Sequence, residues 1–226
     1  MSMPTIVLSD LHLGSDHLER REAEYFFANL PPNANLVLNG DIVDIIHHAL
    51  PEFDQRILDQ IIDESHRRKV VWVYGNHDDG MILKDSGRIQ FCREYNIGTR
   101  LHVNHGYDFD NVIPKNTWFV QTFRWLHMLR IALGAEPVHV AHYAKRWPLL
   151  YRYLRTSVIA NAVEYALERG CEAVTCGHTH YPEDVVQKGV RYINTGSWTE
   201  QPVSYLWVSE DAMELKRLVI GDPIGH

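Results

Sequence analysis

Five short apolar runs in this sequence end in the same way, and this recurrence constrains the fold more than any other feature. Each run is followed at once by Asp, Asn or His, within residues 6–12, 36–44, 70–78, 101–106 and 173–180. Short apolar runs are typical of buried strands, and open α/β sheets bind their ligands at the carboxyl ends of strands. The five segments therefore predict one site, built from loops that lie far apart in the chain.

The polar residues at these strand ends form a candidate metal centre. The candidates are Asp10, His12, Asp41, Asn76, His77, Asp78, His105, His178 and His180. Two ions about 3.5–4 Å apart need an anion between them and neutral or anionic donors around each. Asp, Asn and His supply these donors together, and Asp41 is the group suited to bridge the two ions.

Each candidate taken alone has a plainer interpretation. The chain has 14 His, and a single His is more often a surface or hydrogen-bonded residue than a ligand. A single Asp after a strand usually belongs to a turn or a helix cap. The recurrence of the pattern in five segments favours the metal centre over these separate explanations.

The order of the expected elements indicates a layered α/β domain. Strands are expected at 5–9, 36–38, 70–74, 99–103 and 173–176, and helices at 16–30 (capped by Asp16), from 51, around 80–95 and at 157–169. Four late strands, at 185–186, 190–195, 204–208 and 213–219, are expected to form a mostly antiparallel half. We predict a single domain over residues 1–226 with a helical insert at 111–157.

Composition narrows the classes of function. The hydrophobic fraction of 45% supports a real core, and the net charge of -7 disfavours nucleic acid as a partner. The three Cys fit no metal-binding spacing, which indicates a reducing compartment. No run approaches about 20 uninterrupted apolar residues, and the amino terminus lacks a signal-peptide pattern. These features predict a cytoplasmic protein.

The insert differs from the rest of the chain because it is basic and aromatic. Between residues 115 and 157 it has one acid, Glu136, and seven basic residues: Lys115, Arg124, Arg130, Lys145, Arg146, Arg152 and Arg155. Eight aromatic residues lie in the same span. This mixture suits a small phosphorylated substrate, with a lipid-linked one and peripheral contact with the inner face of a membrane as further hypotheses. A helical hairpin with ordinary solvated arginines has nearly equal weight.

The motifs at the strand ends resemble those of calcineurin-like metallophosphoesterases. They are Asp10-Leu11-His12-Leu13-Gly14, Gly40-Asp41-Ile42-Val43-Asp44, Gly75-Asn76-His77-Asp78, His105-Gly106 and Gly177-His178-Thr179-His180. The resemblance implies a four-layer αββα sandwich and a phosphoester hydrolase with two divalent metal ions. It places Asp10, His12 and His180 on one ion, Asn76, His105 and His178 on the other, and Asp41 between them. It also implies that His77 is the catalytic His, held by Asp78.

The mixed donors leave several ions open, of which Mn is the one we expect and Fe, Zn and Ni are alternatives. The position of the insert resembles that in UDP-2,3-diacylglucosamine pyrophosphatases, where such an insert covers acyl chains. Those enzymes have Arg where this chain has His77, so other substrates stay open. The alternatives are a phosphodiesterase acting on cyclic nucleotides or other small phosphodiesters, a nucleic-acid or phosphoprotein hydrolase, and a non-catalytic metal-binding scaffold. The complete set of candidate ligands favours catalysis.

Overall fold

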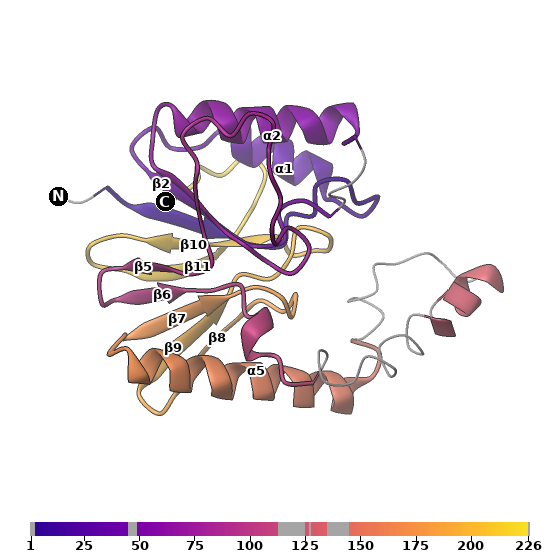
Figure 1. The fold of residues 1–226 in the computed structure, drawn as a ribbon, viewed down its shortest axis with the longest axis vertical. Coiled ribbons are helices and arrows are strands. Elements are labelled where there is room, and N and C mark those ends of the chain that lie inside the picture. The colour runs from indigo at the N-terminus through magenta and orange to yellow at the C-terminus, as the bar shows by residue number, and fades with distance from the viewer. Residues whose placement is uncertain (1–2, 45–48, 113–124, 127, 135–144, 226) are drawn as a thin grey trace.

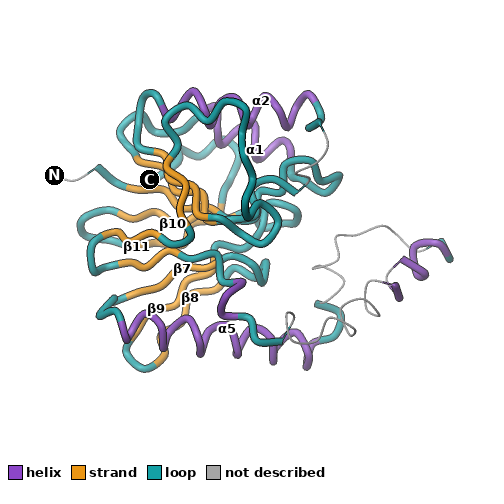
Figure 2. Tube along the Cα trace, viewed as in Figure 1, coloured by secondary structure: helices purple, strands orange, loops and turns teal. Residues whose placement is uncertain are grey.

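The structure is a computed structural model that describes residues 3–44, 49–112, 125–126, 128–134 and 145–225. Two β-sheets pack face to face, and helices cover the outer face of each sheet (Figure 1). Figure 2 shows the same layers, with both groups of strands lying between helices. The arrangement confirms the predicted αββα sandwich. None of the helices within the described ranges is long and apolar enough to cross a membrane.

The first sheet has six strands in the order β11-β10-β1-β2-β3-β4. Strands β1 to β4 are parallel, whereas β10 is antiparallel to β1 and β11 to β10. The register sets Val7 beside Val37 and Val37 beside Val71. The bounds are β1 Thr5–Leu8, β2 Asn35–Asn39, β3 Val70–Val73, β4 Gln90–Cys92, β10 Ser204–Val208 and β11 Met213–Arg217.

The second sheet has five strands in the order β5-β6-β7-β9-β8. Its three central strands β6, β7 and β9 are parallel, and the edge strands β5 and β8 are antiparallel to their neighbours. The bounds are β5 Tyr95–Ile97, β6 Leu101–Val103, β7 Ala173–Cys176, β8 Glu183–Gln187 and β9 Val190–Asn194.

The helices explain why the central strands are apolar throughout. Helices α1 (Arg20–Ala28) and α2 (Glu52–Ser65) flank the first sheet, and α5 (Pro148–Glu168) flanks the second. In β1, Ile6 and Leu8 pack in the cluster with the helices, and Val7 packs in the cluster between the sheets. A strand buried on both faces has no polar alternation. Each such side chain contributes about 1.5–3 kcal/mol to stability.

Two expectations for the first half of the chain are wrong. The expected helix at 80–95 is instead loop followed by β4 and β5, which join different sheets. Gly80 and Gly87 have positive φ angles of 75° and 53°, and Phe91 stacks near Trp72, so backbone conformation and sheet packing oppose the helix. The first helix begins at Arg20, and Asp16 does not cap it, since Glu19 is the N-cap residue.

The late strands and the insert also differ from expectation. The late strands do not form one antiparallel half: β9 is parallel to β7 in the second sheet, while β10 and β11 complete the first. Helix α5 begins at Pro148 rather than at 157, so the last part of the insert is helical and continuous with the domain. Much of the predicted insert lies outside the described residues, and its boundaries stay a prediction.

Candidate metal centre

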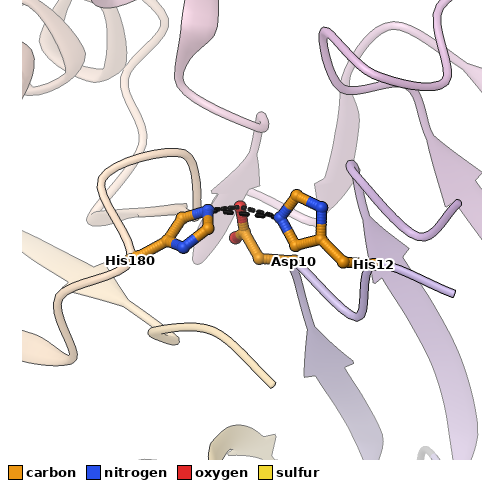
Figure 3. Close-up of side chains that lie close together, drawn as sticks. All are labelled: Asp10, His12 and His180. Carbon is orange, nitrogen blue, oxygen red and sulfur yellow. Dashed lines mark hydrogen bonds and ion pairs between the residues drawn. The ribbon is translucent and has the colours of Figure 1, made fainter. Parts of the chain in front are cut away.

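Three ligand atoms converge where the loops after β1 and β7 meet. His180 Nε2 lies 3.1 Å from Asp10 Oδ1 and 3.2 Å from His12 Nε2, and His12 Nε2 lies 3.8 Å from Asp10 Oδ1. Figure 3 shows the Asp10 carboxylate between the two imidazole rings. All three side chains are buried. One carboxylate and two imidazoles at these distances form a group able to hold one divalent cation.

Asp41 lies next to this group, at the end of β2. Its Oδ2 is 3.2 Å from His105 Nε2, and its Oδ1 accepts a 2.8 Å hydrogen bond from the backbone N–H of His77. One ligand atom from each of Asp10, Asp41 and His105 lies within 4.8 Å of the others. The carboxylates of Asp41 and Asp10 are therefore neighbours at the centre of the site.

The remaining candidates extend the cluster beyond His105. The rings of His105 and His178 have centroids 5.6 Å apart, and His178 Nδ1 lies 3.1 Å from Asn76 Oδ1. The structure thus brings the strand-end candidates of β1, β2, β3, β6 and β7 into one continuous group. Segments separated by up to about 170 residues in the sequence, from Asp10 to His180, meet there.

The backbone at the site is strained in a consistent way. Among the described non-glycine residues, six have a left-handed φ, and the sixth, Lys188, lies in the turn between β8 and β9. A left-handed φ costs a non-glycine residue of order 1–2 kcal/mol and is often retained at functional sites. The other five are all candidate ligands: Asp10 at 53°, His12 at 54°, Asp41 at 52°, His178 at 60° and His180 at 55°.

The electrostatics of the pair Asp41 and His105 favour charge on both groups. Burial alone would raise the pKa of Asp41, but His105, His12 and His77 together hold this pKa well below its ordinary value. Burial alone would lower the pKa of His105, but the carboxylates of Asp41 and Asp10 raise it to about 10. Burial also lowers the pKa of His180, and this favours its neutral, metal-binding form.

The arrangement of donors around His105 fits a metal ion. His105 Nδ1 donates a 2.9 Å hydrogen bond to the carbonyl of Asn39, which fixes the ring and leaves Nε2 to face the site. Nε2 is buried and has no hydrogen-bond partner among the described residues, although Asp41 Oδ2 is close. A buried ring nitrogen that faces two carboxylates is a typical metal ligand. The mixed set of oxygen and nitrogen donors suits Mn, Fe or Zn.

His77 has a different partner from the one expected. Its Nδ1 lies 2.7 Å from Asp44 Oδ1, and the same oxygen is 3.1 Å from His12 Nδ1. Burial alone would lower the pKa of His77, but the contact with Asp44 and the charge of Asp41 raise it. The imidazolium is therefore favoured at His77, which is about one third exposed and has Nε2 3.9 Å from Asp41 Oδ2.

The expectation that Asp78 holds His77 is wrong in this structure. Asp78 is fully buried and accepts hydrogen bonds from the backbone N–H groups of Gly75 at 2.6 Å and Ile42 at 2.8 Å. It also accepts one from Trp72 Nε1 at 3.0 Å. Asp78 therefore ties the loops after β2 and β3 together. Asp44 was missed as a site residue, although it closes the motif Gly40-Asp41-Ile42-Val43-Asp44.

Gly177 packs directly against the metal-site carboxylate. A Cβ at this position would lie 2.1 Å from Asp10 Oδ2 and 2.4 Å from Ser9 Oγ. We expect Gly177→Ala to displace Asp10, weaken Mn²⁺ binding at least about 10-fold and destabilise the fold by about 1–3 kcal/mol. Calorimetric Mn²⁺ titration and thermal melting measure both effects. Gly189→Ala, with open space around it, is the control and should bind Mn²⁺ with native affinity. If Gly177→Ala also bound Mn²⁺ with native affinity, the close packing against Asp10 would be contradicted.

A pocket of about 270 Å³ opens beside the second part of the cluster. It is lined by Asn76 and His105 of the site and by Tyr74, Arg93 and Tyr107 around them. Tyr107 makes an edge contact with the ring of His178, with centroids 5.5 Å apart. Aromatic rings, an arginine and two candidate ligands thus share one cavity, which is large enough for a small organic group.

Comparisons with known proteins agree with this fold. The DNA polymerase II small subunit of Thermoplasma acidophilum is 26% identical over 223 residues, which cover 86% of this chain and 45% of that protein. The chain thus spans less than half the length of that curated relative. Two solved structures are similar to it. The phosphoesterase Yfce of E. coli has a TM-score of 0.50 at 17% identity, covering 98% of this chain and 95% of that one. The nuclease MPE of Pseudomonas putida has a TM-score of 0.47 at 14% identity, covering 95% and 87%.

The family assignment rests on a match over most of the sequence. The model of the calcineurin-like phosphoesterase superfamily domain matches residues 3–211, a span that includes every strand-end motif described above. The chain therefore belongs to the calcineurin-like phosphoesterase superfamily, a family of phosphoester hydrolases.

Proposed function

We propose that this chain is a metal-dependent phosphoester hydrolase that acts on small phosphodiesters or pyrophosphates. The observation that carries the proposal is the convergence of Asp10, His12 and His180 into one buried group beside Asp41. Packing alone does not explain the buried charges and the strained backbone of this group. A metal centre, in contrast, needs both the donors and their orientation. The family of the chain supports the same reading.

The site would hold two divalent cations. Asp10, His12 and His180 would bind one, Asn76, His105 and His178 the other, and Asp41 would lie between them. When bound, the two cations would supply Lewis acidity toward the phosphoryl group and activate water as the nucleophile. Mn is the ion we propose, because imidazole, carboxylate and amide donors are mixed.

The protein's own contribution to the reaction includes proton transfer by His77. Asp44 holds Nδ1 of the ring, so Nε2 points away from Asp44 as the free proton donor. The raised pKa keeps that proton in place near neutral pH. A leaving alkoxide needs a proton, and an imidazolium at the edge of the cluster is suited to give it. Asp44 thereby orients both His77 and the candidate ligand His12.

For substrate class, we propose a nucleotide-linked lipid, as in UDP-2,3-diacylglucosamine pyrophosphatase-like enzymes. The described parts of the insert expose large apolar side chains: Trp125 at 61%, Met128 at 69%, Leu133 at 80% and Leu149 at 84%. Basic residues lie in the same segment. Basic and apolar side chains together suit a ligand that is anionic at one end and apolar at the other. Peripheral contact with a membrane through the insert is part of this proposal.

A second candidate is a phosphodiesterase acting on cyclic nucleotides or other small phosphodiesters. The pocket beside Asn76 and His105 favours it, because Tyr74 and Tyr107 offer rings for stacking, and Arg93, which pairs with Asp79 in the same lining, offers a guanidinium. A non-catalytic metal-binding scaffold is the alternative of another class, and it would bind Mn²⁺ without turnover of any phosphoester.

A panel of substrates, tested with the purified protein, decides between these proposals. We expect Mn²⁺-dependent hydrolysis of a nitrophenyl phosphodiester that is lost in excess EDTA and restored by added Mn²⁺. The panel also includes a phosphomonoester, a cyclic nucleotide, a single-stranded oligonucleotide and UDP-diacylglucosamine. Turnover of none of them by Mn²⁺-bound protein would favour the scaffold.

The role of the insert is tested by removing its exposed apolar side chains. In the double variant Leu133→Ser and Leu149→Ser, we expect KM for UDP-diacylglucosamine to rise at least about 10-fold, since burying one leucine is worth about 1.5–3 kcal/mol. Turnover of the water-soluble diester should not change. Ile82→Ser is the matched control, because Ile82 is 93% exposed and lies outside the insert. Equal KM values in all three proteins would show that the exposed leucines of the insert do not hold the lipid, and absence of turnover of UDP-diacylglucosamine by the native chain would exclude the lipid-linked substrate.

A further inference from the structure

The residue just before the insert and the last part of the insert both contact the loop that carries His178 and His180. Asp110 stands immediately before residue 111, where the insert begins, and Lys145, Tyr151 and Arg155 belong to its last part. Each of these residues contacts the segment 178–183, which follows β7. The two histidines of the His-x-His motif therefore each have a neighbour at one end of the insert.

Asp110 fixes the ring of His178. Asp110 is 3% exposed, and its Oδ2 lies 2.9 Å from His178 Nε2, while its Oδ1 accepts a 2.7 Å hydrogen bond from the N–H of Val112. A carboxylate only accepts hydrogen bonds, so Nε2 of the imidazole carries the hydrogen. Nδ1 then keeps its lone pair and faces Asn76 Oδ1 at 3.1 Å. Two acceptor atoms that face each other are placed as ligands of one cation.

Helix α5 holds Asp110 in this position. The preceding residue, Phe109, packs in the core under α5, and its carbonyl accepts a 2.7 Å hydrogen bond from Asn161 Nδ2 of that helix. The N–H of Asp110 donates to the carbonyl of Tyr107 at 3.0 Å, within the short helical turn Tyr107–Phe109. These hydrogen bonds fix the backbone of Asp110 and of its neighbour Phe109, and they thereby fix the position of the Asp110 carboxylate.

Lys145 and Tyr151 hold the backbone that carries His180. Tyr151 Oη donates a 2.6 Å hydrogen bond to the carbonyl of Thr179, and Lys145 Nζ donates one of 2.6 Å to the carbonyl of His180. Lys145 also pairs with Glu200. Two successive carbonyls are thereby fixed around a residue whose φ of 55° is unfavourable for histidine.

Arg155 secures the next residues of the same segment. Its guanidinium lies 3.6 Å from the centre of the Tyr181 ring, and its Nε donates a 3.1 Å hydrogen bond to Glu183. The contacts of Tyr151, Lys145 and Arg155 thus cover every residue from 179 to 183 except Pro182. These polar contacts are distinct from the packing of α5 on the sheet, which its buried apolar side chains provide.

We propose that the residue before the insert and the last part of the insert position the two histidines of the metal centre: Asp110 orients the ring of His178, and Lys145 and Tyr151 hold the backbone of His180. The inference rests on metal binding at the site of the proposed function and assigns three positioning residues to it. It links the insert to both cation positions. Substrate held by the insert and metal held by the histidines would then influence each other's binding to the same degree.

A titration of the metal-free protein with Mn²⁺ tests the inference without using activity. Electron paramagnetic resonance measures the Mn²⁺ that stays free. We expect Asp110→Asn to weaken binding about 10–100-fold, which is the usual effect of losing a partner that orients a metal-bound imidazole. Tyr151→Phe deletes a single hydroxyl, and we expect it to weaken binding about 3–10-fold, the effect of one hydrogen bond. Lys145→Met should act like Tyr151→Phe, and Lys145→Arg should restore much of the affinity.

Matched controls separate positioning from general damage. Tyr153→Phe removes a hydroxyl from an exposed tyrosine of the same helix, and Lys188→Met removes an exposed lysine of the β8–β9 turn. Both should bind Mn²⁺ like the native chain. Amide hydrogen exchange of residues 177–182 in metal-free protein should be faster in Tyr151→Phe and unchanged in Tyr153→Phe.

The outcomes distinguish this inference from the proposed function. Native affinity in Asp110→Asn and Tyr151→Phe would overturn the inference and leave the proposed function standing. Failure of the native chain to bind Mn²⁺ would overturn both. If Asp110→Asn does not fold, the isosteric Tyr151→Phe decides, because its effect on affinity is then measured against Tyr153→Phe alone.

Discussion

Asp41→Asn is expected to reduce turnover of a phosphodiester by at least about 10³-fold while the fold remains. The side chain faces His105 with one oxygen and lies in the same group as Asp10, so in the proposed function its charge is shared by both cation positions. Loss of several kcal/mol of transition-state stabilisation corresponds to a factor of this size. Asn tolerates the left-handed φ of 52° and can still accept the hydrogen bond from the N–H of His77.

The measurement compares kcat at saturating Mn²⁺ with the number of Mn²⁺ ions bound per chain. Asp184→Asn is the matched control, because Asp184 is a surface residue of β8 that pairs with Arg191; its turnover should equal the native value. Thermal melting confirms that both variants are folded. Native turnover in Asp41→Asn would show that Asp41 does not bridge the cations and would remove the central element of the proposed site.

The positions of the core strands could be predicted because burial leaves a direct signature in the sequence. Strands β1, β2 and β3 are covered on one face by helices and on the other by the second sheet, so they appear as continuous apolar runs. The position of the site followed from the same property, since polar residues begin where the apolar runs end. The left-handed backbone of Asp10 and Asp41 was not visible in the sequence.

The errors arose where tertiary contacts decide the structure. Strand β10 pairs with β1, with Val7 opposite Leu206, and no local pattern near residue 206 reveals a partner about 200 positions away. The segment 80–95 has apolar residues compatible with either a helix or strands, and the pairing of β4 with β3 decides between them.

The partners of the histidines were likewise beyond the sequence. Asp78 follows His77 directly, yet three donors from Gly75, Ile42 and Trp72 turn its carboxylate into the core. Asp44 lies 33 positions before His77 and still occupies the place next to its ring. Adjacent residues in a loop project in different directions, so sequence neighbourhood was a poor guide to which carboxylate holds the imidazole.

His77→Gln is expected to lower kcat by about 10²–10⁴-fold for a substrate with an alkoxide leaving group, because proton transfer by a positioned side chain contributes a factor of this size. The loss should be much smaller for a nitrophenyl diester, since nitrophenolate departs without a proton. Mn²⁺ affinity should remain close to native, because the hydrogen bond to Asp41 Oδ1 comes from the backbone N–H of His77, which the variant keeps, and the His77 ring pairs with Asp44 rather than with Asp10 or His180.

The dependence on the leaving group distinguishes proton donation from a purely orienting role. Asp44→Asn weakens the contact that raises the pKa of His77, so it should shift the alkaline limit of kcat to lower pH and reproduce part of the loss. His66→Gln, at the exposed end of α2, is the control and should leave both rates unchanged. Equal losses for the two leaving groups in His77→Gln would mean that His77 only orients its neighbours, because a proton donor must matter most where the departing oxygen is most basic.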